Sequence, residues 1–335
     1  MSCTHCIQQR IRNSRDSTWI NTDRASQALY DAKSLGLTSS GVNFTGGEPF
    51  LSGSNLPELL KTAQSLKLNT RINTNAWWGN ERHINLGSIR FSSCSHVISW
   101  LREMEVAILA LSFDKRYDDN PLYWNRIISV IRECENQGQH YQIVITGAKQ
   151  EEIEHAWCKL TEIEGITPNH MIPVHMEIVD LGAAANLQDK DISNGSSCSG
   201  KGFYRPNFLH INPTGGVRTC LYAPGSQWLG NIYTHSLIDI CNEFENNFVV
   251  MTFCRNTLDQ LTDTYLTKYV ENGYQLPKHP CASSVLIVRA IEDQHFFEQQ
   301  KGRISTADES NMIVKSIAED YNLYDQNFSA DGSSE

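Results

Sequence analysis

Amphipathic stretches with helical spacing alternate with short apolar runs along the chain as far as residue 179. The first stretch, Asp23 to Leu35, repeats Ala and Leu at the spacing of one helix face. The pattern predicts helices over 23–35, 56–66, 97–104, 121–134 and 153–163. It predicts strands over 42–44, 70–75, 106–112, 141–146 and 172–179. Such alternation is typical of parallel βα units, so we expect an α/β fold.

Polar residues stand where four of these strands end: Thr45, Asn75, Asp114 and Thr146. In parallel βα barrels the loops at the carboxyl ends of the strands converge on the ligand. The alternative is that these residues are polar simply because loops begin there. Four such ends, with Gly-Gly-Glu after one of them, favour a binding site at this edge.

The pattern changes after residue 185, where the sequence becomes rich in Asp, Asn, Gly and Ser. Phe208–Asn212 and Val217–Tyr222 flank a Pro-Thr-Gly-Gly turn, which predicts a β-hairpin, and a helix is expected over 236–244. We therefore expect one domain over 1–185, a second over 186–300, and a polar, partly disordered tail over 301–335.

The composition excludes some functional classes. The chain has 335 residues, 40% of them hydrophobic, and its mean hydropathy is −0.39. No apolar run reaches the roughly 18–20 residues of a membrane span, and no signal-peptide core begins the chain, so we expect a cytoplasmic protein without a membrane partner. A net charge of −10 without a clustered basic face argues against nucleic-acid binding.

Ten cysteines are many for a cytosolic chain, where thiols stay reduced. Cys94, Cys134, Cys158 and Cys241 lie in helical, apolar contexts and are expected to be buried core residues. A metal or redox role is expected for others. The pair Cys3-x-x-Cys6 can reach one metal centre, but alone it also fits half a zinc site or a thioredoxin-like redox pair.

Two stretches together, Cys3-Thr4-His5-Cys6 and Gly46-Gly47-Glu48-Pro49, resemble the radical SAM enzymes. In that family a C-x-x-x-C-x-x-C loop holds a [4Fe–4S] cluster, and a G-G-E-P segment binds the methionine end of S-adenosylmethionine (SAM). The resemblance implies a partial (β/α)6 TIM-like barrel with its first strand missing here. The first cysteine of the family pattern would stand four residues before Cys3, so we expect Met1 to be an internal methionine of a longer chain.

The resemblance also implies roles for individual residues. Cys3 and Cys6 would ligate iron, and His5 would lie beside the adenine. The methionyl group would be held by Gly46, Gly47, Glu48 and Pro49. Ribose or carboxylate contacts would come from Asn75, Ser112 and Asp114, with Thr146 at the same edge. Asn and Asp also cap helices and turns, which is the competing explanation for the last group.

The second region resembles the auxiliary-cluster extension called SPASM, or its shorter form, Twitch. The similarity lies in Cys198, Gly215, Cys220 and the run Gly230-Asn231-Ile232. It implies a small α+β domain with at most one auxiliary iron–sulfur cluster, ligated by Cys198, Cys220 and Cys281, or Cys254 in place of Cys281. The alternative is a hairpin with incidental thiols.

Enzymes with this extension often modify peptides or proteins, so the resemblance implies a peptide or protein substrate. It also implies an electron donor such as flavodoxin or ferredoxin. Two other functions stay open: a truncated or degenerate, non-catalytic scaffold, and a radical SAM enzyme that acts on a small molecule.

Overall fold

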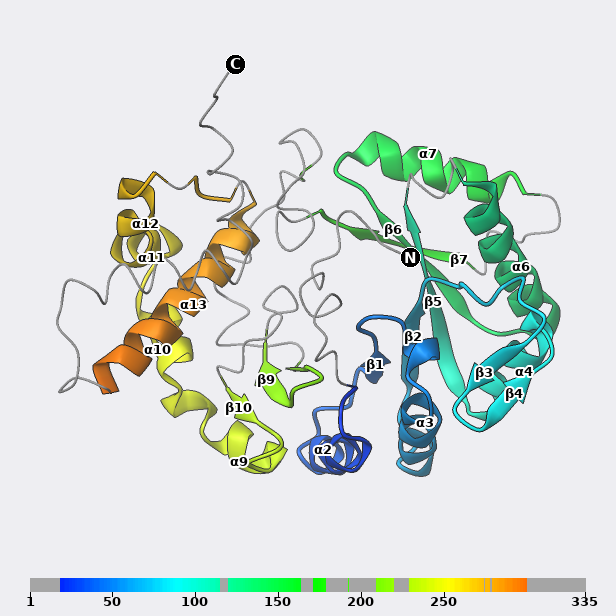
Figure 1. Cartoon of the computed structure of the whole chain (residues 1–335), viewed down its shortest axis with the longest axis horizontal. Helices are drawn as coiled ribbons and strands as arrows, with labels where there is room; N and C mark the ends of the chain where they lie inside the picture. The colour runs from blue at the N-terminus through cyan, green and yellow to red at the C-terminus, as the bar shows by residue number, and fades with distance from the viewer. Residues whose placement is uncertain are drawn as a thin grey trace, which may run out of the picture. The chain divides into compact units, whose positions relative to one another are not determined.

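The structure is a computed structural model, shown in Figure 1. It describes residues 19–114, 120–163, 171–178, 192, 209–219, 229–273, 275–277 and 279–299. The chain divides into two compact units. The first contains Thr18–Glu177 together with Ser236–Ile238, and the second contains the remaining residues; each is described by itself.

A five-stranded parallel sheet forms the centre of the first unit. Its strands lie in the order β1-β2-β5-β6-β7. Their bounds are Val42–Phe44 (β1), Thr70–Thr74 (β2), Val106–Asp114 (β5), Tyr141–Thr146 (β6) and Met171–Met176 (β7). Because all five strands run the same way, their carboxyl ends meet at one edge of the sheet. Asp114 and Thr146, the last residues of β5 and β6, are register partners there.

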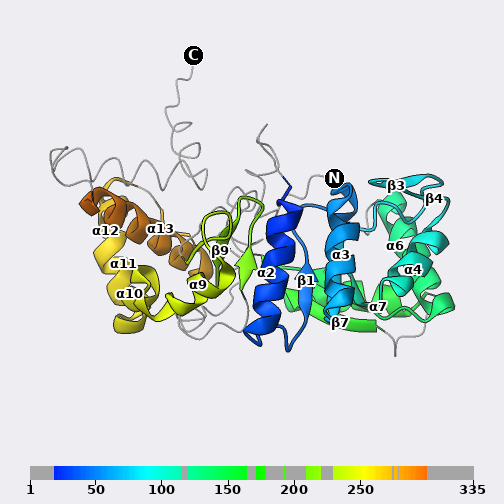
Figure 2. The same cartoon turned by 90° about the horizontal axis from the view of Figure 1, so that it is seen from below.

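Helices connect successive strands. The connecting helices are η1 (Pro49–Leu51), α3 (Asn55–Ser65), α4 (Cys94–Glu103), α6 (Pro121–Gln137) and α7 (Gln150–Thr161). Helix α2 (Thr22–Ser34) precedes β1, and a hairpin of β3 (Ile84–Leu86) with β4 (Ile89–Phe91) precedes α4. The strand order follows the chain order, and βα crossovers are almost always right-handed, so the connecting helices belong on one face. Figures 1 and 2 show α3, α4, α6 and α7 arranged around one side of the strands.

Local sequence explains where these helices begin and end. The side chain of Asn120 accepts a hydrogen bond from the N–H of Leu122, and Pro121 occupies the first turn of α6. Gly138 ends α6 at φ 68°, a left-handed conformation that glycine adopts without a Cβ penalty. A distant contact completes the unit: the N–H of Leu237 donates to Oδ2 of the buried Asp31 at 3.0 Å.

The two faces of the sheet differ in polarity. Ile72, Leu109, Leu111, Ile143 and Ile145 are almost wholly buried and form the core with the connecting helices. Most alternate positions of the same strands are more polar and more accessible, namely Asn43, Arg71, Asn73, Ser112, Gln142 and Thr146. Ala110 and Val144, on this same face, are buried. Parallel strands covered on both faces normally read as continuous apolar runs. This alternation therefore fits a sheet with helices on one face.

The second unit combines a small antiparallel sheet with helices. The sheet contains β8 (His210–Ile211), β9 (Gly216–Arg218) and β10 (Gly230–Asn231), with β9 in the middle. The helices that follow are η5 (Phe244–Asn246), α10 (Phe248–Arg255), α11 (Leu258–Tyr265), α12 (Thr267–Glu271) and α13 (Pro280–Gln299). Helix α9 (Leu237–Asn242) begins with two residues of the first unit and ends in the second. Among the described helices, none has both the length and the apolar composition that a bilayer span requires.

The predicted α/β class with a parallel sheet is confirmed, and all five predicted strands and their helices are present. The predicted hairpin is present as β8 and β9. The β3–β4 hairpin and the helices α10 to α13 were not predicted. The predicted boundary at residue 185 and the tail over 301–335 lie outside the described residues, and closure into a partial barrel stays a prediction.

The expected burial of four cysteines is partly wrong. Cys94 and Cys134 are buried in the core, but Cys241 is only half-buried and Cys158 is exposed. The buried face of α7 is formed by Ile153, Ala156 and Leu160. Cys158 lies two positions from each of the last two, which places it on the outer side of the helix.

Candidate ligand site at the carboxyl edge of the sheet

The loop after β1 exposes glycine backbone at the carboxyl edge of the sheet. Thr45, Gly46 and Gly47 are exposed, whereas the next residue, Glu48, is buried. Gly46 has φ 126°, which side-chain-bearing residues rarely adopt. A Cβ added at Gly46 or Gly47 would meet no atom within 4 Å. The backbone of this loop therefore borders open space in which a ligand can approach closely.

The Glu48 carboxylate fastens this loop to the end of β2. Its Oε1 accepts hydrogen bonds from Thr74 Oγ1 at 2.8 Å and from the N–H of Phe50 at 3.2 Å. Its Oε2 accepts a hydrogen bond from the N–H of Asn75 at 2.8 Å. The bond to Phe50 also caps η1. Both oxygens of Glu48 are thus engaged in shaping the site.

Burial raises the pKa of Glu48 from 4.5 to about 7. The cause is the desolvation of the charged form, which outweighs the hydrogen bonds from Asn75, Thr74 and Phe50 that favour the carboxylate. Near neutral pH this carboxyl group therefore exists in both protonation states.

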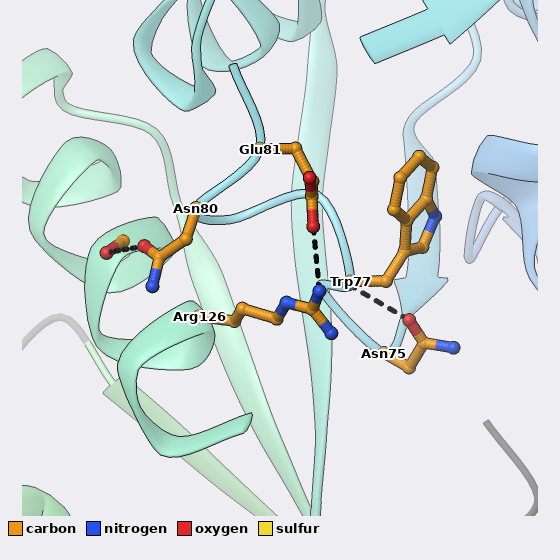
Figure 3. A network of polar contacts seen from close by, with 6 residues as sticks. Asn75, Trp77, Asn80, Glu81 and Arg126 are labelled. Atoms are coloured by element: carbon orange, nitrogen blue, oxygen red, sulfur yellow. Dashed lines mark hydrogen bonds and ion pairs between the residues drawn. The ribbon is translucent and has the colours of Figure 1, made fainter. Parts of the chain in front are cut away.

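Asn75 begins a tight turn directly after β2. Its Oδ1 accepts a hydrogen bond from the N–H of Trp77 at 3.0 Å, as Figure 3 shows. Thr74 Oγ1 accepts a second turn hydrogen bond, from the N–H of Ala76 at 3.1 Å. Ala76 is fully buried at φ 53°. In the described part of the chain Asn75 Nδ2 has no hydrogen-bond partner, so this half-buried amide can donate to a ligand.

The loop that follows is anchored to α6. Arg126 Nη2 forms an ion pair with Glu81 Oε1 at 2.7 Å, and Ser129 donates a hydrogen bond to Asn80 (Figure 3). Gly79 packs directly on the helix, because a Cβ there would lie 2.2 Å from the carbonyl oxygen of Arg126. These contacts give the turn around Asn75 a firm base.

Ser112 and Asp114 lie on β5, the strand next to β2, and Thr146 lies on β6, the strand beyond it. Ser112 and Thr146 are half-buried. Ser112 pairs in register with Val144, and Asp114 pairs with Thr146. The sheet therefore brings the predicted SAM-contacting residues of β1, β2, β5 and β6 to one edge, while their contact with SAM stays a prediction. Pro49, the last residue of the Gly-Gly-Glu-Pro motif, is buried at the start of η1.

Most of the predicted iron ligands cannot be placed in this way, because Cys3, Cys6, Cys198 and Cys220 lie outside the described residues. The predicted adenine contact, His5, also lies outside them.

The two remaining candidate ligands lie in the second unit. Cys254 is exposed on α10, and Cys281 is half-buried in the first turn of α13. The N–H of Cys281 donates to Nδ1 of the buried His279 at 3.1 Å. Within the described ranges no group of three or more His, Cys, Asp or Glu side chains is arranged to hold a metal ion. The metal-ligand assignments therefore stay predictions.

Thr74 is the residue of this site that the sequence did not reveal. It lies 26 residues from Glu48, and only the pairing of β1 with β2 brings the two together. The available signal was the apolar–polar alternation of β2, which places Thr74 on the buried face, where a hydroxyl needs a partner.

Comparison with known proteins supports iron–sulfur chemistry. No curated protein matches the chain. Residues 1–126 match the family described as "4Fe-4S single cluster domain". The matched segment contains the Cys3-x-x-Cys6 pair, the Gly46–Gly47 loop and the turn at Asn75. By this similarity, the chain resembles an iron–sulfur protein with one 4Fe–4S cluster.

Proposed function

We propose that this protein is a radical SAM enzyme that modifies a peptide or a protein. The observation that carries the proposal is the exposed Gly46–Gly47 backbone at the carboxyl edge of a parallel sheet, fixed by Glu48 beside Asn75. The family match supports it, since this 4Fe–4S domain also occurs in radical SAM and SPASM-type proteins. The connecting helices cover only one face of the sheet. The polar face is left for ligands, which supports the proposal further.

The residues present fit the two cofactors. Cys3 and Cys6 supply thiolates, the usual ligands of such clusters. The open space over Gly46 and Gly47 suits a ligand that is bound by backbone atoms. Asn75 Nδ2 would donate a hydrogen bond to the ribose or carboxylate of SAM. The cluster, when bound, supplies the electron that cleaves a C–S bond of SAM to give a 5′-deoxyadenosyl radical.

The contribution of the chain is to bind and orient. Glu48 holds the glycine loop and the Asn75 turn in a fixed relation, so SAM would meet a preformed edge. Both carboxylate oxygens of Glu48 already accept hydrogen bonds from the protein, so Glu48 acts as a positioning residue. The methionyl ammonium would be held by the carbonyl groups of the loop. The buried Pro49 and Phe50 close the base of the site against water. A flavodoxin or ferredoxin would supply the electron.

The test uses the natural full-length protein, purified and reconstituted without oxygen. We expect at least four irons per chain, and 5′-deoxyadenosine after SAM and dithionite are added. Cys6→Ala is expected to abolish both the 5′-deoxyadenosine and about four of the irons. The matched control is Cys158→Ala, which removes an exposed thiol on α7 and should change neither. If the wild-type protein binds no iron, the proposal is wrong and a non-catalytic scaffold is favoured.

A further inference from the structure

A row of polar side chains crosses the sheet face opposite the connecting helices. Asn43 is on β1, Arg71 and Asn73 are on β2, and Gln142 is on β6. Arg71 precedes the end of β2 by three residues, which places its Cα about 10 Å from the carboxyl edge. The row therefore extends from near the carboxyl edge, at Asn43 and Asn73, to Arg71, which lies away from the glycine loop.

The row is joined by hydrogen bonds across three strands. Arg71 Nε donates to Gln142 Oε1 at 2.9 Å. The two residues are on strands either side of β5, whose Ala110 pairs in register with both Asn73 and Gln142. A small residue at this position lets the arginine side chain extend across β5.

Asn43 completes the network. In the amide orientation that satisfies its neighbours, its Nδ2 donates to Asn73 Oδ1 at 2.9 Å and its Oδ1 accepts from Arg71 Nη1 at 3.3 Å. The orientation of an amide group is assigned from hydrogen-bond partners of this kind.

Hydrogen bonds within this network occupy the side-chain oxygen acceptors and leave several N–H donors, among the described contacts, without an acceptor. The side-chain oxygens of Asn43, Asn73 and Gln142 each accept a hydrogen bond within the row. Among the described contacts, Arg71 Nη2, Asn73 Nδ2 and Gln142 Nε2 have no acceptor. Arg71 also has no carboxylate partner in the described part of the chain, although it is half-buried. Its partial burial lowers the pKa of the guanidinium, yet arginine stays charged at any ordinary pH.

We propose that Arg71, Asn73 and Gln142 form a subsite that binds a carboxylate group of the substrate. A carboxylate only accepts hydrogen bonds, and its two oxygens match the fork of an arginine. It would supply both the missing negative charge and the missing acceptors. The inference relies on the proposed function only in calling the ligand a substrate.

The test measures binding of N-acetylglycine, which has one carboxylate beside a peptide group, by saturation-transfer NMR. The natural full-length protein is used without SAM or reductant. The uncharged N-acetylglycinamide is the matched ligand control, and inorganic phosphate is the competing oxyanion. We expect saturable binding of N-acetylglycine and none of the amide.

Two variants test the residues. Arg71→Gln and Asn73→Asp are each expected to weaken N-acetylglycine binding by about tenfold or more, through loss of a charge-assisted donor or gain of a repelling charge. Asn73→Asp is nearly isosteric, so it tests the subsite even if Arg71→Gln does not fold, as judged by circular dichroism. Arg102→Gln, at an exposed arginine on α4, should leave binding unchanged.

Equal binding by the wild type and both variants would overturn the proposal, as would equal binding of the acid and the amide. Binding of phosphate but not of N-acetylglycine, lost in the same variants, would overturn the carboxylate assignment. Because the assay contains no SAM and no reductant, its outcome is independent of 5′-deoxyadenosine formation.

Discussion

The Oε2 atom of Glu48 accepts a hydrogen bond from the backbone N–H of Asn75 at 2.8 Å. This bond joins the loop after β1 to the turn after β2, and Thr74 Oγ1 strengthens the connection through the other carboxylate oxygen. Two segments that are distant in sequence, and that we propose contact SAM, are therefore held together by Glu48. Preorganisation of this kind lowers the conformational entropy that the two loops would otherwise lose when a cofactor binds.

The protonation of Glu48 should make stability depend on pH. Its pKa is raised to about 7 in the folded protein, against 4.5 as its ordinary value. Below pH 4.5 both the folded and unfolded states hold the proton, so the group has no effect. Between pH 4.5 and about 7 the unfolded state loses its proton first, so the free energy of unfolding falls as pH rises, by about 3 kcal/mol in total.

Urea unfolding of wild type and Glu48→Gln at a series of pH values checks this. We expect the free energy of unfolding of the variant to be independent of pH over this range, because glutamine does not titrate. The amide group does not replace both carboxylate oxygens as acceptors, so the variant also loses a hydrogen bond at every pH. Glu58→Gln, at an exposed position of α3, is the control and should keep the wild-type slope. A wild-type slope retained by Glu48→Gln would show that another group is responsible.

The two loop glycines should differ in what they contribute. At Gly47 a Cβ meets open space and φ is not positive, so Gly47→Ala should change the free energy of unfolding by less than about 0.5 kcal/mol. If SAM lies against this backbone, the added methyl group should still raise the Kd for SAM about tenfold. Equilibrium dialysis with labelled SAM measures that affinity.

Gly46 and Gly53 provide the comparison. Gly46→Ala should both weaken SAM binding and cost about 1–3 kcal/mol, because φ is 126°. Gly53→Ala, with φ 64° and open space around it, should cost stability without affecting SAM. Unchanged SAM affinity in both loop variants would remove the glycine loop from the binding site.

The succession of amphipathic stretches and short apolar runs was sufficient to predict a parallel sheet, because βα units give this order of elements and the apolar runs supply buried strand residues such as Ile72 and Ile143. Strand ends follow from the same pattern, which is why Asn75 and Thr146 could be placed at one edge. The partner of Glu48 could not be predicted in this way. Its hydrogen bond to Thr74 depends on which strands pair, and no local pattern specifies that.

The helices of the second unit show a different limit. Short helices depend on their caps more than on periodicity. Thr257 and Gln260 form a capping box that begins α11, and Asn247 caps α10. These signals are present in the sequence but weak alone, because Thr and Asn are equally common in turns.

The contact of Gly79 with α6 should be sensitive to a single methyl group. Gly79→Ala would place a Cβ 2.2 Å from the carbonyl oxygen of Arg126, so the loop must shift. We expect a loss of about 1–3 kcal/mol in the free energy of unfolding, the usual cost of overpacking. Thermal or urea unfolding measures it, and a weaker affinity for SAM should accompany it if the Asn75 turn moves.

Asn80→Ala is the control for Gly79→Ala, because it tests the polar contact of this loop with α6 without introducing a steric clash. It removes the hydrogen bond from Ser129 without adding volume, so we expect a cost of at most about 1 kcal/mol. A cost for Gly79→Ala no greater than this would contradict the close packing of the loop on the helix.

The cysteines should fall into distinct classes when the protein without iron is treated with iodoacetamide and analysed by mass spectrometry. Burial raises the pKa of Cys94 to about 12 and that of Cys134 well above its ordinary value. Because the thiolate is the reactive form, both should stay unlabelled until urea unfolds the chain. Cys158 and Cys254 are exposed and should be labelled in the folded protein.

Reconstitution with iron and sulfide turns this pattern into a test of the auxiliary cluster. A cysteine that ligates iron is protected from alkylation, so we expect Cys281 to lose its reactivity and Cys158 to retain it. Protection of Cys254 in its place would identify the alternative third ligand. If both Cys254 and Cys281 stay reactive while iron is bound at Cys3 and Cys6, the second unit does not supply an iron ligand from α10 or α13, and these two thiols are incidental.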